Sequence, residues 1–191
     1  MVLNGTIINQ NGWVWKLGMN LTHYKNKVTE LPLKDMPQSG VNKLQVGRSV
    51  YDFYMKEWAG VDPDNGNPLW YMDEKDANDN LTGKRVTTSD YASANYYYVN
   101  KSSLPKVYGG FNTSLSWKGF DLSAIFAYSI GGYIYNRDIT MILHNGSLEG
   151  RDWSTEILKR WTPENRYTEV PALSTTSNHW NSASTRFLRN N

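Results

Sequence analysis

Apolar and polar residues alternate between residues 106 and 135 with the period of two that is typical of a β-strand. Lys118 and Gly119 lie between the two halves of this stretch and predict a tight turn. One face is apolar and aromatic at its ends, whereas the other is mostly small and polar. The apolar face comprises Val107, Gly109, Phe111, Thr113, Leu115, Trp117, Phe120, Leu122, Ala124, Phe126, Tyr128 and Ile130. A long hairpin of this kind fits either a soluble β-sandwich or a transmembrane β-barrel.

A second hairpin is predicted near the start of the chain. Asn11-Gly12 is a strong two-residue turn signal, and it lies between an extended segment at residues 6–9 and an alternating strand at residues 13–22. Further extended segments are expected at residues 44–60, 69–72 and 184–188. We interpret the remaining segments as loops, with one or two helical turns near residues 154–161; these loops are residues 27–43, 73–105 and 137–183.

The predicted strands are joined by short turns on one side and by long loops on the other. If the Asn11-Gly12 turn is on the first side, residues 61–67 and Lys118-Gly119 turn there too. Outer-membrane barrels have this asymmetry, with short periplasmic turns and long external loops. About seven strands can be counted, and an odd number leaves two unpaired edges that lipid does not tolerate. We therefore expect an all-β fold of antiparallel up-and-down strands, which forms part of a larger transmembrane β-barrel.

Composition and charge narrow the class of protein further. The chain has 191 residues, a net charge of +2 and no cysteine. These values give no electrostatic case for a nucleic-acid partner and exclude a disulfide framework or a thiolate metal site. Tyrosine and tryptophan, at 13 and 8 residues, outnumber the 5 phenylalanines, as in membrane interfaces and sugar-binding surfaces. No apolar run approaches the roughly 20 residues of a membrane helix, and no signal peptide begins at Met1. The protein is therefore expected to be cytoplasmic or to have residues missing upstream.

Several motifs occur together in a recognisable order. WAGVDPDNGNPLWY at residues 58–71 is followed by LPKVYGGF at residues 104–111 and WKGFDL at residues 117–122. RWTPEN at residues 160–165, Val170-Pro171 and STRFL at residues 184–188 follow in turn, and Asn20, Asn26 and Leu31 fit an earlier strand of the same pattern. In sequence and order these segments resemble the late part of the barrel in SusC/RagA-type TonB-dependent outer-membrane transporters of Bacteroidetes.

The resemblance implies a fold, a location and a set of partners. It implies a plugged barrel of about 22 strands with long extracellular loops, in a bacterial outer membrane. Residues 1–191 would be a partial barrel domain, because the plug, the TonB box and the remaining strands lie outside them. The function implied is uptake of glycans or peptides, driven by the TonB complex and assisted by a SusD-like surface lipoprotein. Outer-membrane lipid and the remaining barrel strands would be the other partners.

Aromatic residues in the predicted external loops are the candidate contacts for substrate or partner proteins. They could stack on sugar rings or anchor a partner, and the alternative is that they pack the loops against one another. The candidates are Tyr96, Tyr97, Tyr98, Trp153, Trp161 and Trp180. By contrast, we expect Trp13, Trp15 and Trp117 beside the short turns to form an interface girdle or face lipid.

The sequence favours neither an enzyme nor a cofactor-binding protein. The three histidines lie in unrelated contexts, and no nucleophile elbow or phosphate-binding loop is present. The run from Asp62 to Gly66 superficially resembles a calcium loop, but its glycine and its last acid fall out of register, so it is interpreted as a turn. Two alternatives to the transporter remain: a soluble or surface carbohydrate-binding β module and, less favoured, a glycoside hydrolase.

Overall fold

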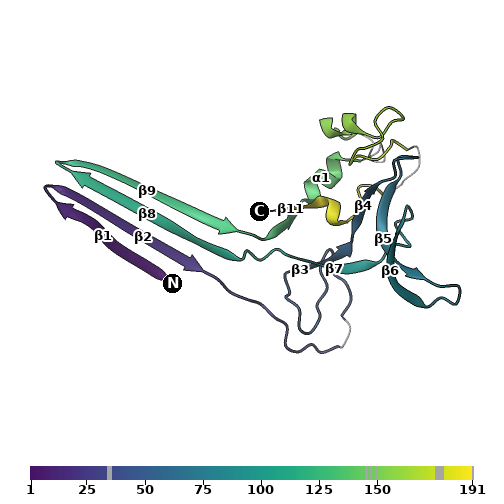
Figure 1. Ribbon diagram of the computed structural model, residues 1–191, viewed down its shortest axis with the longest axis horizontal. Coiled ribbons are helices and arrows are strands. Elements are labelled where there is room, and N and C mark those ends of the chain that lie inside the picture. The colour runs from purple at the N-terminus through teal and green to yellow at the C-terminus, as the bar shows by residue number, and fades with distance from the viewer. Residues whose placement is uncertain (34–35, 145, 147, 149, 175–178, 191) are drawn as a thin grey trace.

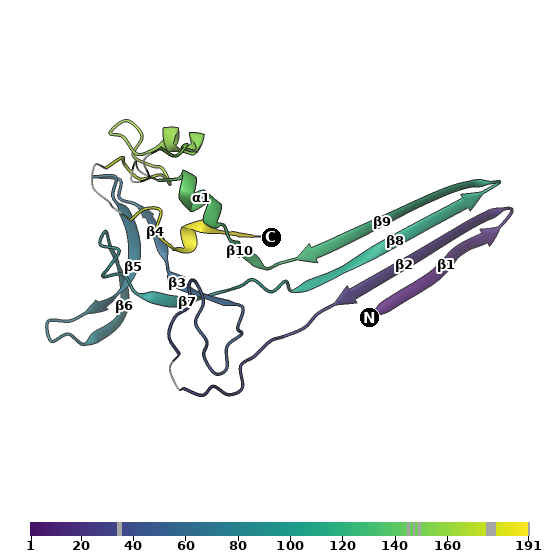
Figure 2. The ribbon, with the colours of Figure 1, turned by 180° about the vertical axis from the view of Figure 1, so that it is seen from behind.

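The computed structural model describes residues 1–33, 36–144, 146, 148, 150–174 and 179–190. Its most extended part is a four-stranded antiparallel ribbon, which we call the wall ribbon (Figure 1). The strand order is β1-β2-β8-β9. The bounds are Val2–Gln10 for β1, Trp13–Thr22 for β2, Val107–Trp117 for β8 and Phe120–Ile130 for β9. The wall ribbon projects from a compact group of loops, and both of its hairpin turns lie at the far end (Figure 2).

Both hairpins of the wall ribbon turn through two residues with positive φ, as the sequence predicts. The φ values are 54° at Asn11 and 79° at Gly12, and 45° at Lys118 and 88° at Gly119. Two consecutive positive φ angles characterise the type I′ turn, whose twist matches that of the flanking strands. The turns therefore set the register of β1 with β2 and of β8 with β9.

The register places most of the apolar residues of the four strands on one face, whereas Val14, Ile125 and Ala127 lie on the other. Trp13 pairs with Trp117, Met19 with Phe111, and Phe111 in turn with Phe126. We call this surface the apolar face; with the residues given above on β8 and β9, it carries Leu3, Ile8, Trp13, Trp15, Leu17, Met19 and Leu21. Its side chains are largely uncovered, and the exposed fraction reaches 76% at Phe120 and 68% at Leu122. The apolar face is thus the surface of the wall ribbon that is suited to lipid rather than to water.

Two polar side chains in the middle of the apolar face are hydrogen-bonded within the wall ribbon. The indole Nε1 of Trp15 donates to Oγ1 of Thr113 at 2.8 Å. The hydroxyl of Tyr128 donates to the backbone carbonyl of Asn20 at 2.8 Å. Hydrocarbon offers no substitute partner for such groups, so this pairing removes the cost of placing them in a bilayer.

The opposite surface, which we call the polar face, carries amides, hydroxyls and the only two charged side chains within the four ribbon strands. These charges are Lys16 and Asp121, and Asp121 accepts a short hydrogen bond from Ser116. Asn4 and Asn112 pair with Gly18 from either side, and a Cβ on Gly18 would come within 2.8 Å of the Asn112 amide. A hydrated barrel lumen is the environment that this composition favours.

The chain between β2 and β8, residues 23–106, leaves and re-enters the wall ribbon at neighbouring positions, since Thr22 pairs with Tyr108. We call it loop A. It contains a two-stranded sheet of β3 (Asp52–Lys56) with β7 (Tyr96–Ser102). It also contains a three-stranded sheet in the order β4-β5-β6, with bounds Trp58–Val61, Pro68–Lys75 and Leu81–Thr88. Loop A is therefore a folded unit.

A second loop follows the wall ribbon, from residue 136 to residue 187, and we call it loop B. It begins after β10 (Tyr133–Tyr135) and ends at β11 (Leu188–Asn190), and these two strands pair with each other. The helix α1 (Arg137–Ile142) begins at Asn136, whose side chain accepts a hydrogen bond from the Ile139 amide. The 3₁₀ helices are η1 (Thr155–Lys159) and η2 (Thr185–Phe187).

No helix in the described part of the chain has the length and apolar character needed to cross a membrane.

Loop A and the strand pair β10-β11, at the base of loop B, share a small apolar core. Phe53 and Met55 of β3 pack with Leu188 of β11, and partly buried residues of loop A and of β10 surround them: Val41, Val99, Tyr133 and Tyr135. A parallel bridge between Lys56 and Ser184 joins the loops at a second point. This packing fixes the two loops relative to each other.

The structure corrects the predicted path of the chain. Residues 44–60 do not cross back along the wall, because β2 pairs directly with β8. The turn at residues 62–67 accordingly lies among the loops, away from the two hairpin turns (Figure 1). Residues 73–105, predicted to be irregular, contain the end of β5 and all of β6 and β7. The count of about seven wall strands was therefore wrong. The wall ribbon still has short turns at one end and long loops at the other, but the loops are fewer and longer than predicted.

Candidate substrate- and partner-contacting surface

The three consecutive tyrosines of β7 point to two different environments because strand side chains alternate. Tyr96 and Tyr98 flank the ring of Tyr54 on β3, with centroid distances of 5.6 and 4.8 Å. The guanidinium of Arg48 lies 4.6 Å from the centroid of Tyr98, whose hydroxyl donates to the Lys43 carbonyl at 3.0 Å. These three rings hold β3 against β7, and the ring of Tyr96 remains the most exposed of them.

Tyr97 lies on the other side of β7 in a charged cluster. Its hydroxyl donates to the Asp73 carboxylate at 2.8 Å, and the Arg85 guanidinium lies 3.7 Å from its ring centroid. Arg85 also pairs with Glu57 at 2.7 Å. Burial, followed by the hydrogen bond to Asp73, raises the pKa of Tyr97 to about 12. Tyr97 therefore stays a neutral donor that ties β7 to β5 and β6.

A buried lysine lies between the two loops. Lys56 is 4% exposed, and its ammonium donates to the backbone carbonyls of Tyr91 and Ala92. It also lies 4.1 Å from the ring centroid of Tyr91. Burial lowers the pKa of Lys56, and the carboxylate of Asp90 opposes that effect. Carbonyl and aromatic contacts thus replace the water that Lys56 loses.

Trp161 of loop B rests on the turn at residues 62–67 of loop A. Its indole Nε1 donates to the Pro63 carbonyl at 3.0 Å, and its ring covers Gly66, where a Cβ would lie 2.6 Å from the indole. Gly66 also has a φ of 74°, so both backbone and space require glycine. Asp62 is occupied within this turn, where it accepts hydrogen bonds from the Asp64 amide and the Asn65 side chain. The described residues contain no group of three or more metal-ligating side chains.

Trp180 is buried inside loop B. It is 1% exposed and packs with Ile157 and Val170. The guanidinium of Arg186 lies 5.6 Å from its ring centroid and donates to its backbone carbonyl at 3.1 Å. Burial lowers the pKa of Arg186 to about 10, a value at which the guanidinium still carries its charge at neutral pH. In this position Trp180 shapes loop B from within.

Trp153 is the most exposed of the predicted aromatic contacts, at 43%. Its indole Nε1 donates to Nδ1 of His144 at 3.1 Å, and the backbone amides of Gly146 and Leu148 donate to the same nitrogen at 3.2 and 3.4 Å. Burial, followed by the charge of Arg151, lowers the pKa of His144. A neutral His144 therefore holds the indole of Trp153 by a hydrogen bond, while part of the side chain stays exposed.

The structure adds surface residues that the sequence did not single out. Tyr167 is 92% exposed and Leu158 is 74% exposed, both on loop B. Tyr167 borders a hollow of about 400 Å³ between β4 and residues 166–169. A single aromatic residue between polar neighbours gives no periodic signal, so the sequence pattern could not show that it would point outward.

Taken together, the six predicted residues do not form one binding surface. Tyr96 and Trp153 expose aromatic area, while Tyr97, Tyr98 and Trp161 are half-buried and Trp180 is buried. Tyr96, Trp153, Leu158 and Tyr167 are among the aromatic and apolar residues that the two loops expose.

Comparisons with known proteins identify relatives over most of the chain. No protein-family model matches. TonB-dependent receptor P3 of Formosa agariphila is 24% identical over 182 residues, and TonB-dependent receptor P26 of the same organism is 28% identical over 190 residues. Each alignment covers 88% of this chain and 18% of the receptor.

Solved structures give the same relationship. The RagAB peptide transporter matches with a TM-score of 0.81 and 31% identity, and the RagAB peptide importer in its open-open state matches with 0.80 and 29%. Both matches cover 99% of this chain and 20% of the solved chain. The chain thus spans about a fifth of the length of the proteins it resembles. It is related to TonB-dependent receptors of the SusC/RagA type and has the fold of a stretch of their transmembrane β-barrel with its loops.

Proposed function

We propose that this chain forms part of the wall and external loops of a TonB-dependent nutrient importer in a bacterial outer membrane. Residues 1–191 would belong to its barrel domain. The observation that carries the proposal is the apolar face, where exposed side chains lie beside polar atoms already paired within the wall ribbon. A soluble carbohydrate-binding module would need to cover this face, and Phe120 and Leu122 are instead largely exposed.

Peptides are the first substrate class to test, and glycans are the second. The similarity to a peptide transporter supports the first, and the exposed aromatic rings of the loops suit either. We propose that Tyr96 and Trp153, joined by Tyr167 and Leu158, contact the substrate or a SusD-like lipoprotein. Tyr97, Tyr98, Trp161 and Trp180 would act indirectly by holding the loops in place. Energy would come from the TonB complex through parts of the receptor outside this chain.

Fractionation and uptake test the proposal. The native protein is expected in the outer-membrane fraction, and its deletion is expected to abolish uptake of a labelled oligopeptide or oligosaccharide pool. Depletion of TonB should abolish the same uptake. A water-soluble native protein, or uptake that persists unchanged in both strains, would exclude an importer.

A double variant tests the contacting residues. Tyr167→Ser with Leu158→Ser removes the most exposed apolar area of loop B, and Leu81→Ser removes a 66% exposed side chain on β6 as the matched control. We expect the double variant to weaken substrate binding or co-purification with the lipoprotein by about tenfold, and the control to change neither. Equal behaviour of the two variants would place the contacts elsewhere.

A further inference from the structure

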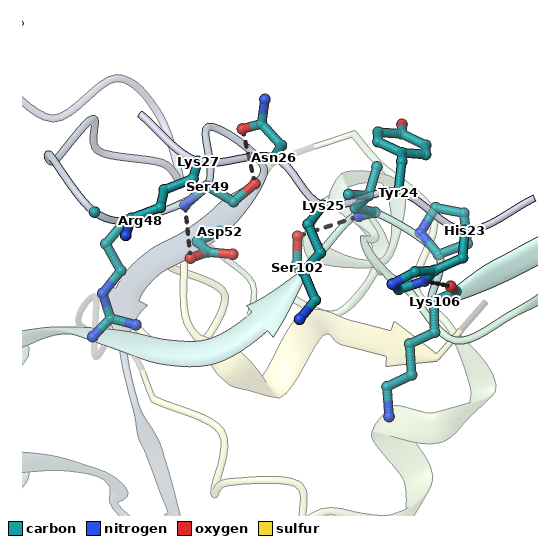
Figure 3. A pocket seen from close by; sticks show the side chains of 13 residues that line it. His23, Tyr24, Lys25, Asn26, Lys27, Arg48, Ser49, Asp52, Ser102 and Lys106 are labelled. Carbon is teal, nitrogen blue, oxygen red and sulfur yellow. Dashed lines mark hydrogen bonds between the residues drawn. The ribbon is translucent and has the colours of Figure 1, made fainter. Parts of the chain in front are cut away.

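A pocket of about 450 Å³ lies where the wall ribbon meets loop A (Figure 3). Three segments contribute to it: residues 23–27 after β2, residues 47–52 up to the first residue of β3, and residues 102–106 from the end of β7 to the start of β8. Lys27 and Arg48 lie at one end, His23 and Lys106 lie at the other, and Asp52 lies between them (Figure 3). The pocket is therefore at the loop end of β2 and β8, where the apolar face stops.

Cationic residues outnumber acidic residues in the lining. Lys25, Lys27, Arg48 and Lys106 are cationic, and Asp52 is the one carboxylate among the residues that line the pocket. Within the described part of the chain, the structure records no ion pair for Lys25, Lys27 or Lys106. Asp52 accepts a hydrogen bond from the Ser49 amide at 3.2 Å. The pocket thus has an excess of positive charge that its own residues do not neutralise.

Hydrogen bonds join the three segments, so the backbone of the pocket is fixed. The amide of Val28 donates to the Arg48 carbonyl, and the amide of Gly47 donates to the Val28 carbonyl, both at 2.8 Å. The side chain of Asn26 accepts from the Val50 amide at 2.9 Å. His23 Nδ1 contacts the Lys106 carbonyl at 2.5 Å. A site with a preformed backbone loses less entropy when a ligand binds.

Arg48 is also oriented by its neighbours. Its guanidinium lies over the ring of Tyr98, and one of its nitrogens donates to Asn100 at 3.2 Å. A guanidinium has five N–H donors in a planar fork, so further donors remain for a ligand. An arginine fork beside lysines matches the several oxygens of a phosphate group better than those of a neutral sugar.

We propose that this pocket binds a phosphate group. Two sources share that chemistry: the phosphorylated headgroup of a lipid in the leaflet beside the loops, and a free phosphate or soluble phosphate ester. The lipid source rests on the proposed membrane location, because the pocket borders the end of the apolar face. The free source does not depend on it.

Calorimetry on the native protein in a non-ionic detergent tests the proposal with two probes. One is inorganic phosphate, and the other is phosphatidic acid in mixed micelles, compared with diacylglycerol, which lacks the phosphate. Binding of phosphatidic acid alone assigns the lipid source, binding of inorganic phosphate assigns the free source, and both results support the site. Binding of neither probe overturns it.

Three variants connect binding to the pocket. Lys27→Gln with Arg48→Gln should weaken binding by about tenfold, whereas Lys84→Gln with Lys159→Gln, which neutralises exposed cations elsewhere, should change it less than about twofold. Asp52→Asn keeps an oxygen for the Ser49 amide and removes the negative charge, so it should tighten binding by about threefold. A misfolded protein cannot produce that gain. Unchanged binding in the double variant, or no gain in Asp52→Asn, contradicts a phosphate site here.

Discussion

The hydroxyl of Tyr128 on β9 donates to the backbone carbonyl of Asn20 on β2 at 2.8 Å, across the intervening strand β8. Gly109 makes this possible, because it pairs with Tyr128 and leaves its side of β8 open. A Cβ on Gly109 would collide with the Asn20 carbonyl oxygen and lie 2.7 Å from the Tyr128 hydroxyl. An aromatic ring over a cross-strand glycine is a known device for fixing strand register.

Gly109→Ala should therefore destabilise the wall ribbon. We expect a loss of about 1–3 kcal/mol in the free energy of unfolding, which is the usual cost of overpacking. Denaturant titration of the native protein in detergent measures it. Gly5→Ala is the matched control, because a Cβ on this other ribbon glycine meets nothing within 4 Å. Equal stability of the two variants would show that β8 and β2 separate freely at this point.

The two faces of β9 should respond oppositely to charge. Leu122→Arg places a charge on the apolar face and should cost about 2–4 kcal/mol at mid-bilayer depth, and less near an interface. Ser123→Arg places the same charge on the polar face and should leave assembly nearly unchanged. Recovery of folded protein in the outer-membrane fraction compares them. If both variants assemble equally well, the apolar face does not contact lipid.

Two ion pairs of loop A differ in their surroundings, and their removal should differ accordingly. Arg85 pairs with Glu57 and also covers the Tyr97 ring, so Arg85→Gln removes both contacts. Lys75 and Asp79 form an exposed pair within one turn region. We expect Arg85→Gln to cost about 1–2 kcal/mol and Lys75→Gln less than about 0.5 kcal/mol. Thermal unfolding of loop A, followed by hydrogen exchange of β6 and β7, distinguishes the two.

Acid should loosen loop B through His144. Its pKa is lowered in the folded state from the ordinary value of 6.5, so the unfolded segment binds the proton more tightly. The contribution of His144 to stability is complete above pH 6.5 and falls as the pH drops below that value. Protonation of Nδ1 also converts the acceptor of three hydrogen bonds into a donor.

Hydrogen exchange of residues 150–154, corrected for its intrinsic pH dependence, measures this effect. Protection should be constant above about pH 6.5 and should decrease from there to about pH 5 in the native protein. His144→Gln cannot gain the proton, so its exchange should vary much less over the same range. Matching pH profiles for the two proteins would assign the change to another group.

Alternation along the chain predicted both hairpins and both faces of the wall ribbon, because strand register follows from a turn and a local period of two. The pairing of Thr22 with Tyr108 could not be predicted in this way. The pairing depends on loop A folding back on itself. A short apolar segment such as residues 52–56 has the same sequence pattern whether it forms a strand inside a loop or a strand of the barrel wall. The helical turn near residues 154–161 is confirmed by η1, where Ser154 accepts from the Glu156 amide.

The candidate contact residues show a second limit of prediction from the sequence. Composition identified the aromatic residues of the loops, but not which of them would be covered. Trp180 is buried because Ile157 and Val170 pack beside it, whereas Tyr167 is 92% exposed. Exposure of a loop side chain is a property of the packed loop, and single positions in a sequence carry no information about it.

The adjacency of Thr22 and Tyr108 closes loop A at its base independently of the residues inside the loop. Its two ends are held one strand spacing apart by β2 and β8, whatever lies between them. The entropy of closing such a segment grows only slowly with its length, so residues can be added or removed there at modest cost. A receptor built on this plan can acquire a new external surface by exchange of one segment while every strand pairing in its membrane portion stays the same.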